Sequence, residues 1–153
     1  KAIYSTLTGD PHYYRIQSDV DFDFYAGILA AKIGECALER KFSFEVLDSE
    51  FHNIDVADGE NFKWTPWYEE YGKQWYWNGP EIGKNFLSDR IYKAGTYYIK
   101  VFNSNNTGQY IMAVGDIEKF SFTDIIGLIF SLGDIEDEFW DPNLCGLSLQ
   151  ESS

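Results

Sequence analysis

The sequence predicts a mostly β protein, built as an antiparallel sandwich or barrel. Aromatic residues make up 18% of its 153 residues, and aromatic side chains suit a pleated, half-buried surface. Short runs of β-forming residues alternate with turn signals about every eight to twelve residues, as in antiparallel β folds. Two such runs, 94–102 and 109–115, flank the turn-forming segment Asn103-Ser104-Asn105-Asn106-Thr107-Gly108. This pattern predicts a β-hairpin near residue 105.

The remaining strands follow from alternation and from turn residues. Gly9-Asp10-Pro11 is a strong turn signal between two short runs of β-forming residues. The run over 21–30 alternates, which places four apolar residues on one face, namely Phe22, Phe24, Ala26 and Ile28. In chain order we expect strands over 2–8, 12–17, 21–30, 42–48, 50–57 and 86–92, ahead of the hairpin.

After residue 115 the periodicity changes. Apolar residues recur at spacings of three and four in the set Phe122, Ile125, Ile126, Ile129 and Leu132, which predicts an amphipathic helix. Ser121 suits the N-cap of this helix and Gly133 its C-terminal stop. The sequence thus divides into a β domain over 1–115 with an aromatic insertion at 62–78, a helical extension over 116–140 packed on the sandwich, and a tail over 141–153.

The charge of the chain limits its partners. The formal net charge is −13, and nine acidic residues but one basic residue lie after residue 114. An acidic surface repels phosphate backbones and anionic lipid headgroups, which excludes nucleic acid and disfavours membrane contact. Cys36 and Cys145 are the two cysteines. They form one disulfide bond if the protein is exported, or remain two free thiols.

Three strand motifs resemble the pre-peptidase C-terminal domains. Asp10-Pro11-His12-Tyr13-Tyr14-Arg15-Ile16 resembles the D-x-x-Y-Y-x-F strand near the start of that family. Ala94-Gly95-Thr96-Tyr97-Tyr98-Ile99-Lys100-Val101 is similar to its penultimate A-G-T-Y-Y-I-x-V strand, and Gly108-Gln109-Tyr110-Ile111-Met112-Ala113-Val114 to its closing G-x-Y-x-L-x-V strand. The resemblance covers about residues 1–115. It implies a jelly-roll-like β-sandwich that is secreted or displayed on the cell surface, is not catalytic and serves as an accessory to another domain.

An aromatic block over 62–77 is the main candidate for ligand binding. Half of its residues are aromatic, and if 74–78 is a strand, Trp75 and Trp77 share one face while Tyr76 takes the other. Rings of this kind either fill a small core beneath a loop, bind carbohydrate as flat platforms, or contact another protein or domain. The candidate ligand-binding residues are Trp64, Trp67, Tyr68, Tyr71, Trp75 and Trp77.

Asp19, Asp21 and Asp23 alternate along the chain and form the candidate metal site. A strand would place the three carboxylates on one face, where Ca²⁺ would relieve their repulsion. Phe24 and Ala30 stand where an EF-hand loop needs Gly and Glu, so that motif is excluded. Solvated carboxylates in a turn are the alternative.

Catalytic motifs are absent from the sequence: there is no G-x-S-x-G, Walker A or H-E-x-x-H pattern. We therefore expect a non-catalytic, extracytoplasmic accessory or binding module of unknown ligand. The alternatives are a carbohydrate-binding module that uses the aromatic block and, less favoured, a small glycan-active hydrolase, which would require two facing carboxylates.

Overall fold

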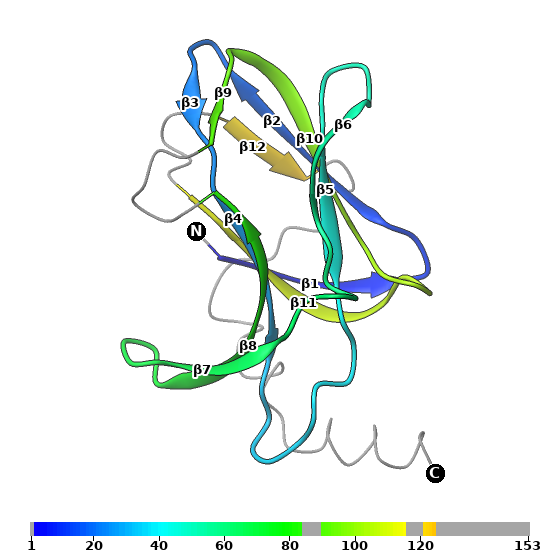
Figure 1. The fold of residues 1–153 in the computed structure, drawn as a ribbon, viewed down its shortest axis with the longest axis vertical. Helices are drawn as coiled ribbons and strands as arrows, with labels where there is room; N and C mark the ends of the chain where they lie inside the picture. The colour runs from blue at the N-terminus through cyan, green and yellow to red at the C-terminus, as the bar shows by residue number, and fades with distance from the viewer. Residues whose placement is uncertain (1, 84–89, 116–120, 125–153) are drawn as a thin grey trace.

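The structure is a computed structural model that describes residues 2–83, 90–115 and 121–124, the last four by their backbone alone. Its described strands are all paired antiparallel, and they form two five-stranded sheets and one two-stranded sheet (Figure 1). No helix occurs among the described residues. The mostly β, antiparallel class expected from the sequence is therefore confirmed.

The two large sheets are named here the first and the second sheet. The first sheet has the order β1 (Ala2–Thr8), β11 (Thr107–Val114), β4 (Ala26–Ala31), β8 (Gln74–Ile82) and β7 (Thr65–Glu69). The second has the order β12 (Ser121–Asp124), β2 (His12–Ser18), β10 (Gly95–Phe102), β5 (Ser43–Leu47) and β6 (Asn53–Ala57). The short strands β3 (Phe22–Asp23) and β9 (Ile91–Tyr92) pair with each other.

The main hydrophobic core draws on both large sheets. It joins Ile28 and Met112 of the first sheet to Phe44 and Ile99 of the second, all with no exposed surface. Alternation along each strand directs one set of apolar side chains inward, and their burial drives the two sheets together. A second cluster, formed by Tyr4, Leu29, Tyr76 and Ile111, lies on the opposite face of the first sheet.

The hairpin predicted near residue 105 is wrong in its pairing. Both strands exist, but β10 pairs with β2 and β5 in the second sheet, whereas β11 pairs with β1 and β4 in the first. The loop between them therefore carries the chain from one sheet to the other. Asn106, at φ 53°, and Gly108, at φ 110°, adopt the left-handed backbone that this turn requires. The loop also contacts the β1–β2 turn, because the Gly9 amide donates to the Asn106 carbonyl at 2.7 Å.

The strand expected over 21–30 is interrupted. The structure divides it into β3 and β4, which belong to different sheets. Its four predicted inward residues are nevertheless all buried in the main core, namely Phe22, Phe24, Ala26 and Ile28. The alternation thus predicted which side chains are buried and missed the break in pairing.

The start of the predicted helix is also wrong. Ser121–Asp124 form β12, which pairs with β2 from Ser121 opposite Gln17 to Asp124 opposite Tyr14. The spacing of apolar residues in the sequence gives no information about the backbone N–H and C=O groups along the edge of β2. Pairing with that edge makes residues 121–124 a strand, although their apolar spacing is typical of a helix. The rest of the predicted helix, from residue 125, and the tail lie outside the described residues.

Cys36 is disulfide-bonded. It lies in the connection between β4 and β5, where its amide donates to the Ile33 carbonyl at 2.9 Å. The chain has one other cysteine, Cys145. Of the two alternatives left open by the sequence, the structure supports the disulfide. Within the described residues no helix is both long and apolar enough to cross a membrane.

Candidate functional site

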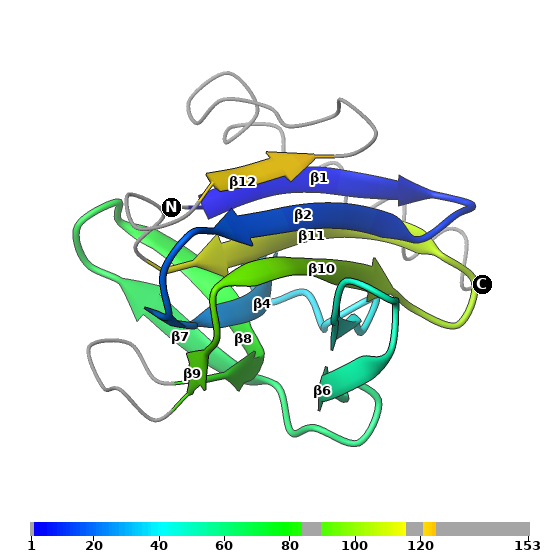
Figure 2. The ribbon, with the colours of Figure 1, turned by 90° about the horizontal axis from the view of Figure 1, so that it is seen from above.

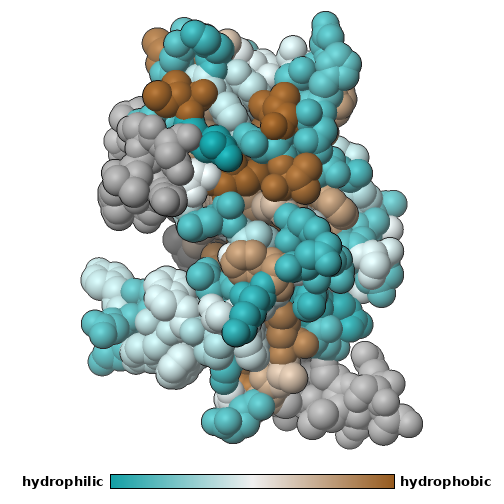
Figure 3. Space-filling view, in the orientation of Figure 1, coloured by the Kyte–Doolittle hydropathy of each residue, from teal (hydrophilic) through white to brown (hydrophobic). Residues whose placement is uncertain are grey.

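The aromatic block folds into a hairpin at the edge of the first sheet. β7 pairs with β8 from Thr65 opposite Asn78 to Glu69 opposite Gln74. β4 pairs with β8 only as far as Tyr76, so the end of this hairpin extends past β4. Figures 1 and 2 both place β7 well apart from β6, and Figure 3 shows the hairpin as a lobe beside the body of the molecule. We call residues 65–78 the aromatic hairpin.

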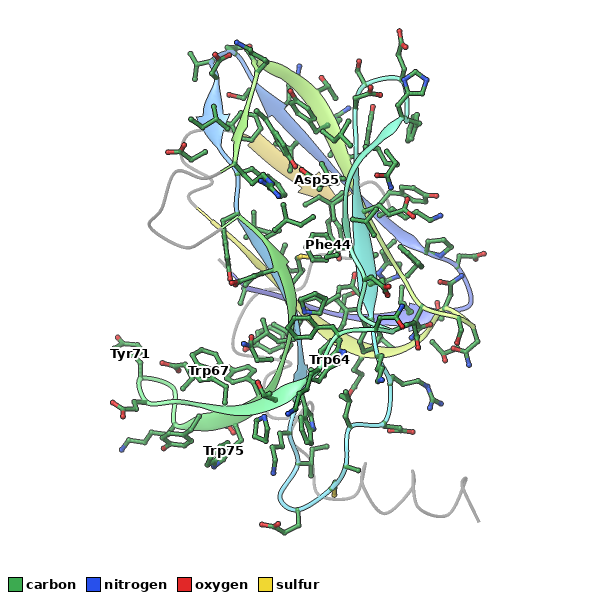
Figure 4. The ribbon with its side chains drawn as sticks, viewed as in Figure 1. Phe44, Asp55, Trp64, Trp67, Tyr71 and Trp75 are labelled. Atoms are coloured by element: carbon green, nitrogen blue, oxygen red, sulfur yellow. The ribbon has the colours of Figure 1, made fainter. Side chains whose placement is uncertain are left out.

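The hairpin carries aromatic rings on both faces, because side chains alternate and cross-strand partners share a face. Trp67 lies opposite Tyr76, and Tyr68 lies opposite Trp75. Figure 4 shows Trp67 and Trp75 on opposite sides of the ribbon, with Tyr71 at the tip. The expected division of Trp75 and Trp77 from Tyr76 is confirmed: Trp77 packs against the main core and Tyr76 belongs to the second cluster.

One face presents three rings and a lysine. We call Tyr68, Trp75 and Trp77 the aromatic ledge. Tyr68 is 39% exposed and Trp75 48% exposed, and their ring centroids lie 5.2 Å apart. The Lys32 ammonium lies 5.7 Å from the centroid of Trp75 and 5.6 Å from that of Trp77. It also donates to the Gly34 carbonyl at 2.6 Å, so a cation borders the ledge on its β4 side.

The opposite face has one exposed ring among polar side chains. Trp67 is 45% exposed and packs on the buried Tyr76, with ring centroids 5.4 Å apart. Its cross-strand neighbours on this face include Gln74 and Asn78, whose amides can donate and accept hydrogen bonds.

The turn of the hairpin is held by a carboxylate. Glu69 accepts hydrogen bonds from the amides of Tyr71, at 2.8 Å, and Gly72, at 2.5 Å. Lys73 adopts φ 56°. With the backbone closed in this way, the Tyr71 side chain is 98% exposed.

Trp64 differs from the other candidate residues. It is 8% exposed and belongs to the main core, and its indole N–H donates to the Gly59 carbonyl at 2.9 Å. A Cβ placed on Gly79 would lie 2.4 Å from the Trp64 ring, so this ring packs directly on the β8 backbone. Trp64 fills the core and is not part of the exposed surface.

The candidate calcium ligands do not converge. Asp19, Asp21 and Asp23 are all exposed, and Asp21 accepts the Ala94 amide at 2.9 Å and faces the Lys93 ammonium at 3.9 Å. Within the described ranges, no three acidic, histidine or cysteine side chains form a group suited to a metal ion. The calcium site stays a prediction.

The two histidines lie in different environments, one buried and one exposed. His12 is buried, and its Nδ1 lies 2.7 Å from the Tyr110 hydroxyl, which also bonds the Tyr14 hydroxyl. His52 is exposed beside Asp48, with 3.4 Å between Nδ1 and the carboxylate. The His52 amide holds the pKa of Asp48 below its ordinary value. The buried cluster joins β2 to β11 across the core, which is a structural role.

A second polar cluster, near β9, consists of Tyr92, Asp55 and Arg90. The Tyr92 hydroxyl donates to Asp55 at 2.5 Å, and the Arg90 guanidinium lies 3.8 Å from the same carboxylate. Burial raises the pKa of Tyr92, and the hydrogen bond to Asp55 raises it further. Because these groups neutralise one another, we assign the cluster a structural role too.

No protein-family model and no curated protein matches this chain. The aromatic hairpin therefore has to be interpreted from its own geometry.

The sequence indicated the aromatic block but not Lys32. Lys32 follows β4 and reaches Trp75 only because β4 and β8 pair. No spacing in the sequence connects the two residues, so only the pairing of these strands identifies the cation of the ledge.

Proposed function

We propose that this protein is a non-catalytic, extracytoplasmic binding module whose aromatic hairpin binds carbohydrate. The observation that carries the proposal is the exposure of four large aromatic side chains on one hairpin: Trp67, Tyr68, Tyr71 and Trp75 are between 39% and 98% exposed. Concentrated exposed aromatic surface is a marker of binding sites, because it contributes nothing to folding while it stays in water.

Carbohydrate suits these rings for a chemical reason. The C–H groups of a sugar ring carry partial positive charge, and the face of an aromatic ring carries partial negative charge. Tyr68 and Trp75 supply such faces, and the Tyr68 hydroxyl can bond sugar hydroxyls beside them. On the opposite face, the amides of Gln74 and Asn78 can do the same beside Trp67. Few polar groups beside several rings are typical of ligand sites.

Export is part of the proposal. A disulfide bond at Cys36 favours an oxidising compartment, in agreement with the resemblance of residues 1–115 to secreted pre-peptidase C-terminal domains. A jelly-roll-like sandwich of that type, acting as an accessory to another domain, is the form of module that we propose.

Absence of catalysis belongs to the proposal as well. Glu69 follows Tyr68 on β7, and its carboxylate accepts two backbone amides of its own turn. A glycosidase would instead use two carboxyl groups facing each other across the substrate.

Contact with another protein or domain is the second candidate function. Trp and Tyr are also enriched at protein interfaces, and Tyr71 at the tip is 98% exposed. A protein partner would bury the tip of the hairpin, whereas a glycan would protect the rings on one face.

The test is a titration of the full chain against a panel of soluble and insoluble polysaccharides, by calorimetry and by sedimentation with the insoluble polymers. The double variant Trp67→Ala/Trp75→Ala removes an exposed ring from each face. The control is Phe51→Ala, since Phe51 is 55% exposed and lies on the β5–β6 loop.

We expect at least one glycan to bind, with affinity at least about tenfold weaker in the double variant and unchanged in the control. If no polysaccharide binds, or if the control loses as much affinity as the double variant, the proposal fails. A parallel titration with Ca²⁺ alone examines the candidate site at Asp19, Asp21 and Asp23.

A further inference from the structure

The inclination of two rings limits which glycan the hairpin can bind. Tyr68 and Trp75 are cross-strand partners, and their ring planes meet at 54°. A flat surface can lie against only one of two planes inclined in this way. A ligand that contacts both rings must therefore turn between them.

The borders of the aromatic ledge limit its length. Trp77 is half-buried and packs against the main core, whereas Tyr68 is 39% exposed and Trp75 is 48% exposed. The accessible part of the ledge is thus its Tyr68–Trp75 end. Trp67 lies on the other face of the hairpin and cannot extend this surface into a wider plane.

The charge of the protein limits the charge of the ligand. The chain carries a net −13, and the hairpin contains Glu69 and Glu70 together with Lys73, with Glu69 held in the turn. Lys32 and Lys73 do not outweigh these two carboxylates, and Lys32 already donates to a carbonyl. A polyanion would meet net repulsion, and an uncharged polymer would not.

We propose that the Tyr68–Trp75 end of the ledge binds a single, soluble chain of uncharged glycan that twists between the two rings. Flat faces of crystalline polysaccharide and polyanionic glycans are excluded as ligands of this surface. The inference rests on the proposed function, since it specifies the ligand class of the same hairpin.

The experiment compares three ligand classes on the full chain. Soluble uncharged chains are represented by hexaoses of glucose, mannose and xylose, measured by calorimetry. Microcrystalline cellulose and chitin are measured by sedimentation, and polygalacturonate by calorimetry at low and high salt. The variants are Trp75→Ala, Tyr68→Ala and Trp67→Ala, with Phe51→Ala as the control.

We expect at least one hexaose to bind, and we expect no retention on crystalline polymer. Trp75→Ala and Tyr68→Ala should each weaken hexaose binding at least about tenfold, whereas Trp67→Ala and the control should change it less than about twofold. If the aromatic ring at position 75 contacts the glycan, Trp75→Phe should retain most of the affinity, because this variant keeps a ring at that position.

Three results would overturn this inference while leaving the proposed function intact. They are binding to crystalline polymer with no binding of any hexaose, salt-sensitive binding of polygalacturonate, and loss of affinity in Trp67→Ala with none in Trp75→Ala. If no glycan of any class binds, the proposed function itself fails.

Discussion

Replacing Trp64 and Trp75 in turn separates the two roles of the aromatic block. Trp64 is 8% exposed and donates to the Gly59 carbonyl, whereas Trp75 is 48% exposed and lies on the ledge. Removal of a buried Trp side chain costs about 3–5 kcal/mol, because contacts are lost and a cavity remains. For a chain of this size that cost lowers the melting temperature by roughly 6–20 °C.

A milder substitution at the same position, Trp64→Phe, should cause a smaller loss in the free energy of unfolding. It retains most of the buried ring and loses the N–H donor to Gly59, so we expect a loss of about 1–2 kcal/mol in the free energy of unfolding. Trp75→Ala loses exposed surface and the contact with Lys32, and should cost about 1 kcal/mol or less. Should Trp64→Ala fail to fold, the phenylalanine variant still allows the comparison.

The assay is urea unfolding followed by far-ultraviolet circular dichroism, which does not depend on the tryptophan that is removed. Glycan binding is then measured on each variant at a temperature where it is folded. We expect Trp64→Phe to bind as the wild type does and Trp75→Ala to lose affinity. The reasoning is refuted if Trp75→Ala destabilises the protein more than Trp64→Ala, or if folded Trp64→Phe loses binding.

Three further predictions concern stability. Tyr110→Phe removes the hydroxyl shared by His12 and Tyr14 and should cost about 1–3 kcal/mol in urea unfolding. Tyr68→Phe, which removes an exposed hydroxyl, should cost almost nothing, and equal stability of the two variants would contradict a structural role for the buried cluster. The raised pKa of Tyr92 means that the unfolded state ionises first, at about pH 10. Its contribution to stability is therefore complete below about pH 10 and is lost as the pH rises further; urea titrations from pH 9 to pH 12 should show a shallower decline in Tyr92→Phe, and an unchanged slope would refute this. Because Cys36 is disulfide-bonded, a reducing agent should lower the free energy of unfolding by about 2–4 kcal/mol, and a non-reduced digest should join the peptides of Cys36 and Cys145. A midpoint that does not respond to reductant, or a response that persists in Cys36→Ser, would count against it.

Most strands could be predicted because burial on one face leaves a period of two in the sequence. The run over 21–30 is the clearest case, since all four residues predicted to face inward are in the core even though the chain breaks between β3 and β4. The same alternation correctly separated Tyr76 from Trp75 and Trp77. Such predictions need only the local geometry of a strand.

Pairing could not be predicted in the same way. The runs of β10 and β11 are adjacent in the sequence and joined by a good turn, yet each pairs with strands of a different sheet. Ser121 suits the N-cap of a helix by its residue type, but the backbone of Ser121–Asp124 pairs with β2. In both cases the deciding hydrogen bonds come from strands that are distant in the sequence.

In the candidate site, too, some features follow from the sequence and others only from the tertiary structure. The sequence by itself determined the antiparallel β class, the inward residues of the run over 21–30 and the presence of an aromatic block, because these depend on residue type and on the alternation of side chains. Only the tertiary structure decided that Trp64 is core while Trp67 and Trp75 are exposed, and that Lys32 borders the ledge. Burial and contact at those positions depend on which strands lie beside them, and that is settled by the packing of the whole chain.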